Sequence, residues 1–273
     1  MNNIKMLGID LDGTLLNKEK TVSEKNKQAI RACINNGIEV YLISGRPYCF
    51  TKYIANLISD KVKTIAANGG TYEIGNRCIE QPIIKDSIDA IVEALKQTNA
   101  HAFFKGKHEF FTHEPYDKQF LYDHMNPVFS MDNQVLSKVE LNWDTLKAEA
   151  HDIVKILVYD RDIDALKQLR KQIECIKNIE ITDYQAISFD LTANKVNKGN
   201  AIKEVLKENG WNKMNFMAIG DANNDLPMFR EASLKVAMQN ASQEIKEYCD
   251  VVTTACEEDG VAKAIEDYIL ISK

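Results

Sequence analysis

The 273-residue sequence has no long apolar run and no excess of basic residues. Its longest apolar stretches, 38–44 and 216–219, are the size of a strand and too short to span a bilayer. The 40 acidic residues outnumber the 34 basic residues, so the formal net charge is -6. This balance gives no electrostatic attraction to nucleic acid or to an anionic membrane, and we expect neither as a partner.

The sequence also lacks clustered cysteines. Its six cysteines form no Cys-x-x-Cys pair and do not gather with histidine, which argues against a zinc site and for free thiols in a reducing compartment. Residues 1–8 are too short and too polar to form the apolar region of a signal peptide. We therefore expect a cytoplasmic protein. The sequence predicts no oligomeric state.

Strand and helix patterns alternate at both ends of the chain. Apolar runs at 4–10, 38–44 and 64–67 are separated by helical patterns between Ser23 and Gly37 and at 48–58. After residue 191 the pattern returns, with a helix at 198–209 and an apolar strand at 216–221. Such alternation predicts a parallel sheet with helices on both faces.

The middle of the chain is more aromatic and less regular. Two short strands, 102–105 and 109–112, flank Gly106 and predict a hairpin whose alternate aromatic residues pack inside. A less favoured interpretation of this hairpin is a nucleic-acid surface. A third interpretation is that Lys105 or Lys107 faces a substrate. The predicted fold is α/β, with a doubly wound, Rossmann-like parallel-sheet core (1–80 and 190–273) interrupted by an inserted α+β domain (81–189).

The first chemical motif is Asp10-Leu11-Asp12-Gly13-Thr14, directly after the first strand. In open parallel sheets, ligands bind beyond the carboxyl ends of the strands. Two carboxylates this close repel each other, and a bound cation is the natural compensation. The plainer alternative is an acidic turn after a strand.

Two further motifs contain groups that suit a phosphate. Ser44-Gly45-Arg46-Pro47 follows the second strand, and the hydroxyl of Ser44 and nearby backbone N–H groups can hold a phosphoryl oxygen. The alternative is that Ser44 caps the next helix. Lys198 begins a helix, where its charge opposes the helix dipole and requires an anionic partner. A solvated surface lysine is the alternative there.

The fourth motif runs from Gly220 to Asp225 between a strand and a helix. Its carboxylates offer the hard oxygen ligands that Mg²⁺ prefers. Asp225 has an alternative role as a helix N-cap, whereas Asp221 comes straight off an apolar strand.

These four motifs, in this order, resemble those of the haloacid dehalogenase superfamily. Asn68-Gly69, Met238-Gln239-Asn240-Ala241 and Glu258-Asp259-Gly260-Val261 are similar to recurring segments of its Cof-type phosphatases (subfamily IIB), in which a C2-type cap that governs substrate specificity is inserted between the second and third motifs. The resemblance implies a magnesium-dependent phosphatase that forms an aspartyl-phosphate.

The resemblance also implies residue roles. Asp10 would be the nucleophile, and Asp12 the general acid and base, a role that suits a raised pKa. Magnesium would be held by Asp10, Asp221 and the backbone carbonyl of Asp12. The groups that would bind the phosphoryl group are Leu11 and Gly45 through their N–H groups, and Ser44, Lys198 and Asn224 through their side chains. Asp225 would support Lys198 or the outer shell of the metal.

The expected substrate is a small phosphorylated metabolite, with sugar phosphates foremost and pyridoxal phosphate or nucleotides as alternatives. Two other functions fit the same core. A phosphomutase would return the phosphate to its product instead of releasing it, and a non-catalytic sugar-phosphate sensor would be expected to lack Asp10 or Asp12, both of which are present.

Overall fold

The computed structural model describes residues 3–113 and 136–270, and within these the chain divides into two compact units. The first unit comprises the described residues of 1–79 and 197–273, and the second comprises those of 80–196. Among the described residues, no helix is long and apolar enough to cross a membrane. All six cysteines lie in the described part, and no disulfide joins them.

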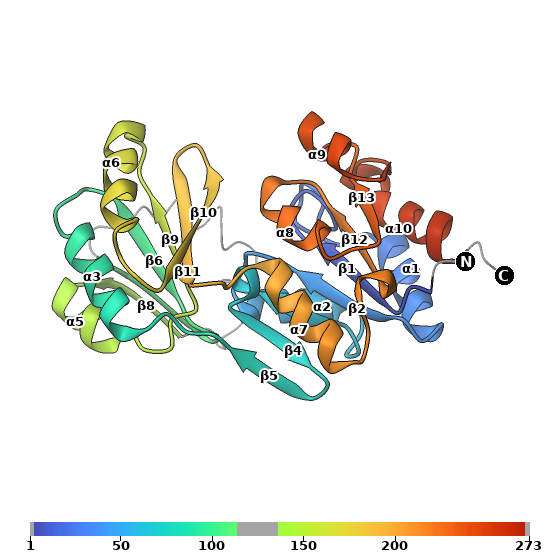
Figure 1. Cartoon of the computed structure of the whole chain (residues 1–273), viewed down its shortest axis with the longest axis horizontal. Helices are drawn as coiled ribbons and strands as arrows, with labels where there is room; N and C mark the ends of the chain where they lie inside the picture. The colour runs from blue at the N-terminus through green and yellow to red at the C-terminus, as the bar shows by residue number, and fades with distance from the viewer. Residues whose placement is uncertain (1–2, 114–135, 271–273) are drawn as a thin grey trace. The chain divides into compact units, whose positions relative to one another are not determined.

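The first unit is built on an eight-stranded sheet (Figure 1). In spatial order its strands are β14 (Val251–Val252), β13 (Leu234–Ala237), β12 (Phe216–Gly220), β1 (Met6–Asp10), β2 (Glu39–Ile43), β3 (Lys63–Ala66), β4 (Thr71–Ile74) and β5 (Arg77–Glu80). The pairs from β14 to β3 are parallel, and β4 runs antiparallel to β3. The predicted parallel α/β core is confirmed, with an antiparallel edge that was not predicted.

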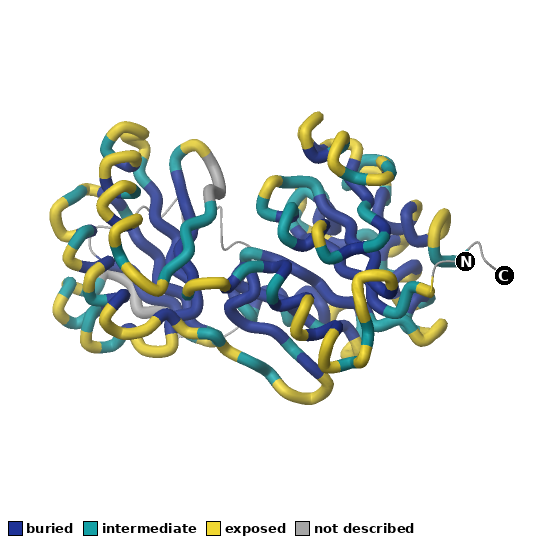
Figure 2. Tube along the Cα trace, in the orientation of Figure 1, coloured by how far each residue is buried: buried dark blue, intermediate teal, exposed yellow. Residues whose placement is uncertain are grey.

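Helices cover both faces of this sheet because its strands are apolar on both faces. Alternate residues of β1 belong to different clusters, since Leu7 and Ile9 pack on one side and Met6 packs on the other. The first cluster includes residues of α1 (Glu24–Asn35), α2 (Tyr48–Ile58) and α10 (Gly260–Ile265), and the second includes residues of α7 (Lys198–Glu208), α8 (Leu226–Phe229) and α9 (Gln243–Tyr248). Figure 2 shows the resulting band of buried strands.

The second unit contains a six-stranded sheet in the order β10 (Ile179–Gln185), β11 (Ser188–Ala193), β9 (Lys155–Tyr159), β6 (His101–Lys105), β7 (Glu109–His113) and β8 (Leu136–Leu141). The helices in the described part of this unit are α3 (Lys85–Leu95), α5 (Trp143–Glu149) and α6 (Ile163–Ile173). All its pairs are antiparallel except β7 with β8. The predicted hairpin is present as β6 and β7, with Phe104 and Phe111 in the core.

Candidate active site

The predicted site residues gather at the carboxyl edge of the parallel sheet of the first unit. Asp10 is the last residue of β1, Ser44 follows β2, and Asp221 follows β12. The strand order changes direction at β1, with β2 on one side and β12 on the other. A ligand crevice is expected at such a switch point, because the connections leave the sheet there in opposite directions.

Lys198 lies between two carboxylates. Its Nζ atom is 2.6 Å from Oδ1 of Asp10 and 2.6 Å from Oδ1 of Asp225, and all three side chains are buried. The start of α7 approaches α8 closely, since a Cβ atom on Gly199 would lie 2.4 Å from the carbonyl oxygen of Pro227. The alternative of a solvated surface lysine is therefore wrong.

The side chain of Asp225 holds the turn of the fourth motif in place through hydrogen bonds. Its Oδ2 atom accepts hydrogen bonds from the backbone N–H groups of Asp221 and Ala222, both at 3.1 Å. Gly220 leaves room for this arrangement, because a Cβ there would lie 2.6 Å from the same oxygen. Asp225 occupies the N-cap position of α8, but its side chain does not cap that helix. Its carboxylate serves the preceding turn and Lys198 instead.

Asp221 is held by the first motif. Thr14 Oγ1 donates to Asp221 Oδ1 at 2.7 Å, and Thr14 is fully buried. Gly13 has φ of +82°, and a Cβ atom on it would lie 2.4 Å from Asp221 Oδ2. Glycine at this position satisfies both the left-handed backbone and the close approach of the carboxylate.

Asp12 faces two cations and stands apart from the other carboxylates. Arg46 binds it through two parallel hydrogen bonds of 2.7 Å, and Lys20 Nζ lies 2.9 Å from its Oδ1. Burial opposes ionisation of Asp12, but Arg46 and Lys20 outweigh it and hold its pKa below the usual range. The expectation of a raised pKa is wrong for this conformation, because the carboxylate is ion-paired.

The pKa values of Asp10 and Asp221 shift in the opposite direction. Burial raises the pKa of Asp10 well above its ordinary value, and the neighbouring charge of Asp225 adds to this effect. Burial and Asp225 likewise raise the pKa of Asp221 to about 6. Burial alone would lower the pKa of Lys198, but Asp10 and Asp225 raise it above its ordinary value. The lysine is therefore a permanent cation.

The carboxylates fit a divalent cation. Asp10, Asp221 and Asp225 each offer an oxygen, and these oxygens lie within 4.8 Å of one another. When all three acids are ionised, Lys198 neutralises one of three charges and leaves two. Both oxygens of Asp225 already accept hydrogen bonds, so Asp10 and Asp221 are the better ligands. The side chain of Asp12 does not belong to this cluster.

The other predicted residues lie around the same strand ends. Ser44 is buried, and its Oγ atom accepts from the N–H of Arg46 at 3.1 Å, whereas the N-cap of α2 is Pro47. The alternative of Ser44 as the helix cap is therefore wrong. Leu11 is buried, Gly45 is half-buried, and the Oδ1 atom of Asn224 is buried without a hydrogen-bond partner in the described part of the chain.

Sequence reasoning missed the partners of Asp12 and Asp221. Arg46 and Thr14 lie within the motifs that were recognised, so their positions offered a signal, although no role was assigned to them. Lys20 offered none, because it reaches Asp12 from a turn in which its own φ is +57°. Such a backbone conformation is uncommon for a residue with a side chain and cannot be predicted from composition.

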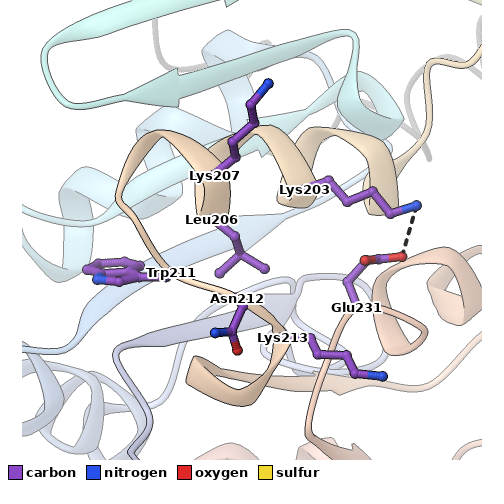
Figure 3. Close-up of a pocket in the computed structure, with 7 residues that line it drawn as sticks. All are labelled: Lys203, Leu206, Lys207, Trp211, Asn212, Lys213 and Glu231. Atoms are coloured by element: carbon purple, nitrogen blue, oxygen red, sulfur yellow. Dashed lines mark ion pairs between the residues drawn. The ribbon is translucent and has the colours of Figure 1, made fainter.

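A pocket of about 430 Å³ lies elsewhere on the first unit (Figure 3). It is lined by Lys203, Leu206, Lys207, Trp211, Asn212, Lys213 and Glu231. The Nζ atom of Lys203 pairs with the carboxylate of Glu231 at 3.2 Å. None of the predicted site residues lines this pocket, and the lysine that begins α7 faces the carboxylate cluster instead.

Comparison with known families gives an extensive match. The sequence model of the haloacid dehalogenase-like hydrolases matches residues 7–265. A Bacillus subtilis (strain 168) protein, the 5-amino-6-(5-phospho-D-ribitylamino)uracil phosphatase YcsE, is 30% identical over 272 residues, which cover 98% of this chain and 97% of that protein. A phosphoglycolate phosphatase of Methanothermobacter thermautotrophicus is 26% identical, and the match covers 97% of this chain and 99% of that protein.

Solved structures agree with the sequence match. A haloacid dehalogenase-like hydrolase from B. subtilis superposes with a TM-score of 0.86 at 26% identity. The match covers 97% of this chain and 100% of that one. The similarity thus extends through both units and includes every strand end that carries a predicted site residue.

Proposed function

The chain belongs to the Cof-type branch of the haloacid dehalogenase superfamily and is a phosphoric monoester hydrolase, and on this premise we propose that it hydrolyses small phosphate monoesters. In the proposed reaction, Asp10 forms an aspartyl-phosphate and magnesium is the cofactor. One observation carries the proposal. The Nζ atom of Lys198 contacts Asp10 at the carboxyl edge of the sheet, beside a second carboxylate, Asp221, that fits a divalent cation.

In the first step, a carboxylate oxygen of Asp10 attacks phosphorus. The new oxygen–phosphorus bond forms as the bond to the leaving oxygen breaks, and that oxygen takes a proton from Asp12. Lys198 reduces the repulsion between the anionic nucleophile and the anionic phosphate. When bound, Mg²⁺ supplies further charge neutralisation and polarises a phosphoryl oxygen.

In the second step, water hydrolyses the aspartyl-phosphate. Asp12 removes a proton from the water, whose oxygen bonds to phosphorus while the bond to Asp10 breaks. Inorganic phosphate leaves and the Asp10 carboxylate is restored. Splitting the hydrolysis in this way replaces one slow step with two easier steps.

Asp12 must leave its ion pair to do this work. Its contacts with Arg46 and Lys20 favour the ionised form, which cannot donate a proton. We propose that Asp12 turns from these cations towards the leaving oxygen and takes up a proton when substrate binds. Lys20 is the weaker restraint of the two, because its side chain is 41% exposed.

The phosphoryl group is assigned to side chains and backbone amides around Lys198. The predicted donors are the N–H groups of Leu11 and Gly45, the hydroxyl of Ser44 and the amide of Asn224. The donor of Asn224 would be its Nδ2 atom, because the amide oxygen can only accept a hydrogen bond.

For the substrate class we propose sugar phosphates or related phosphorylated polyols. YcsE acts, by its name, on a phosphoribityl compound, and the relative from M. thermautotrophicus acts on phosphoglycolate. Both substrates are small monoesters of aliphatic alcohols. We assign selection among such substrates to the inserted unit, and substitution of Lys105 or Lys107 tests whether its hairpin takes part.

The test is phosphate release from a panel of sugar phosphates, phosphoglycolate, nucleotides and pyridoxal phosphate, with magnesium and then with EDTA. Release that requires magnesium and disappears in Asp10→Asn is the expected result. If folded protein with magnesium releases phosphate from none of these compounds, hydrolysis of small monoesters is wrong, and isomerisation of sugar phosphates should be measured instead.

A further inference from the structure

Asn240 connects two segments that are far apart in sequence. It follows β13, and its Nδ2 atom donates to the carbonyl oxygen of Gly13 at 2.7 Å. Its Oδ1 atom accepts from the N–H of Cys256 at 3.1 Å. Because only the amide nitrogen can donate and only its oxygen can accept, these two contacts fix the orientation of the amide.

The carbonyl of Gly13 is an effective point at which to hold the first motif. Glycine has a wide choice of backbone conformations, so the peptide beside it is the least restrained part of the loop. That peptide is planar, and its carbonyl direction sets the position of Thr14. A hydrogen bond to Gly13 O therefore limits where the Thr14 side chain can point.

Thr14 in turn holds Asp221. Its hydroxyl donates to Asp221 Oδ1 at 2.7 Å, and Asp221 Oδ2 lies 2.4 Å from the position that a Cβ atom of Gly13 would take. Both oxygens of this carboxylate thus meet the segment that Asn240 restrains. Partners of this kind orient a metal ligand and commonly determine how tightly the metal binds.

We propose that Asn240 is a positioning residue for Asp221, acting through the Gly13 carbonyl and the Thr14 hydroxyl, so that its loss weakens binding of the divalent cation. The inference rests on the proposed metal site of Asp10 and Asp221. Asn240 is exposed, and its side chain hydrogen-bonds to Gly13 and Cys256 and not to either carboxylate in the described part of the chain, so its effect must pass through the first motif.

Neighbouring contacts provide a matched control. The segment around Cys256 also bonds to the β1–α1 connection, because Lys18 N–H donates to Glu257 Oε1 at 2.7 Å. The helix that follows this segment, α10, bonds to α1, because Ala262 N–H donates to Asn26 Oδ1 at 2.8 Å. Glu257→Ala removes one bond between these segments without touching Gly13, Thr14 or Asp221. It measures what loosening the segments alone does to the metal site.

The experiment measures Mn²⁺ binding to substrate-free protein, with free Mn²⁺ detected by electron paramagnetic resonance. Mn²⁺ favours the same oxygen ligands as Mg²⁺. We expect Asn240→Ala and Thr14→Val each to raise Kd about 10-fold. The Kd of the double variant should be no more than about threefold higher than that of either single variant, because both changes break the same chain of contacts. Thr14→Ser keeps the hydroxyl and should retain Mn²⁺ affinity. Glu257→Ala should bind Mn²⁺ as tightly as the unaltered protein does.

Unchanged affinity in Asn240→Ala overturns the proposal, and so does a double variant whose Kd rises by the product of the single effects. If Asn240→Ala fails to fold, Asn240→Asp carries the same test, since it keeps the acceptor for Cys256 and removes the donor to Gly13. The negative charge that it adds would by itself favour a cation, so a raised Kd in this variant would still point to the lost contact. Asp221→Asn separates the two levels of inference. If that variant binds Mn²⁺ as tightly as the unaltered protein, the proposed metal site is itself wrong; if it loses binding while Asn240→Ala does not, only the role of Asn240 is wrong.

Discussion

The Nζ atom of Lys198 lies 2.6 Å from the Oδ1 atom of Asp10, although 188 residues separate them along the chain. The inserted unit lies between them in sequence, and the second contact of Lys198, with Asp225, ties the start of α7 to the fourth motif. The carboxylates keep the lysine charged despite burial, and the lysine offsets part of their mutual repulsion.

Replacing Asp10 with asparagine should abolish turnover and leave the fold intact. The amide has nearly the same size as the carboxylate. Removing the negative charge of Asp10 relieves repulsion among the buried acids, so thermal stability should not fall. We expect the rate of phosphate release to fall by at least about 10⁴-fold, as for loss of a nucleophile in other covalent enzymes. Residual activity within 100-fold of the unaltered protein would argue against Asp10 as the nucleophile.

Lys198→Ala should damage both activity and stability. Turnover should fall on the order of 10²–10³-fold, as for loss of one preorganised electrostatic donor. Breaking a buried ion pair also leaves uncompensated charge, which costs about 3–5 kcal/mol of unfolding free energy. Urea unfolding of Lys198→Ala with and without Asp10→Asn tests this cause, since the second change should recover part of the lost stability. No recovery would mean that packing, and not charge, explains the loss.

The positions of the four motifs could be predicted because parallel topology brings strand ends together. Apolar runs located β1, β2 and β12, and the helix 48–58 has the predicted bounds. The partners of the motifs could not be predicted in the same way. The contact of Lys20 with Asp12 depends on a positive φ, and that of Asn240 with Gly13 joins residues 227 positions apart. Neither arises from periodicity or from local propensity.

Two features at the sheet edges were also missed. The strands β4 and β5 are joined at Gly75-Asn76, a two-residue sequence typical of tight hairpins, so a signal was present there. The sequence contained no signal for the parallel pairing of β7 with β8, because tertiary packing determines the pairing partner of an edge strand.

The stability of metal-free protein should depend on pH through Asp221. Its pKa is about 6 in the folded chain, because of burial and then the charge of Asp225, and about 3.9 when unfolded. Between these values the folded state holds more protons, so the free energy of unfolding should fall as pH rises from about 4 to about 6. Asp10 shifts in the same direction. Urea unfolding in EDTA should show a smaller slope for Asp221→Asn, and equal slopes would contradict this assignment.

Added magnesium should oppose that loss. Because protons and cations compete for the same carboxylates, the stabilisation by a fixed concentration of Mg²⁺ should be larger at pH 7 than at pH 5. Asp221→Asn provides the control, since it removes one of the competing sites. Stabilisation that is equal at both pH values would place the bound ion away from Asp10 and Asp221.

A pair of glycines separates backbone strain from the metal site. Gly13 and Gly37 have similar left-handed conformations, with φ of +82° and +78°, but their surroundings differ. A Cβ at Gly13 would meet Asp221 Oδ2 at 2.4 Å, whereas a Cβ at Gly37 would meet no atom within 4 Å. Alanine at either position should cost about 1–2 kcal/mol of unfolding free energy through the backbone alone. Only Gly13→Ala must also displace Asp221, so it alone should weaken Mn²⁺ binding and turnover, by 10-fold or more. Gly13→Ala with unchanged metal affinity would show that glycine is required there for its backbone and not for the space that the carboxylate occupies.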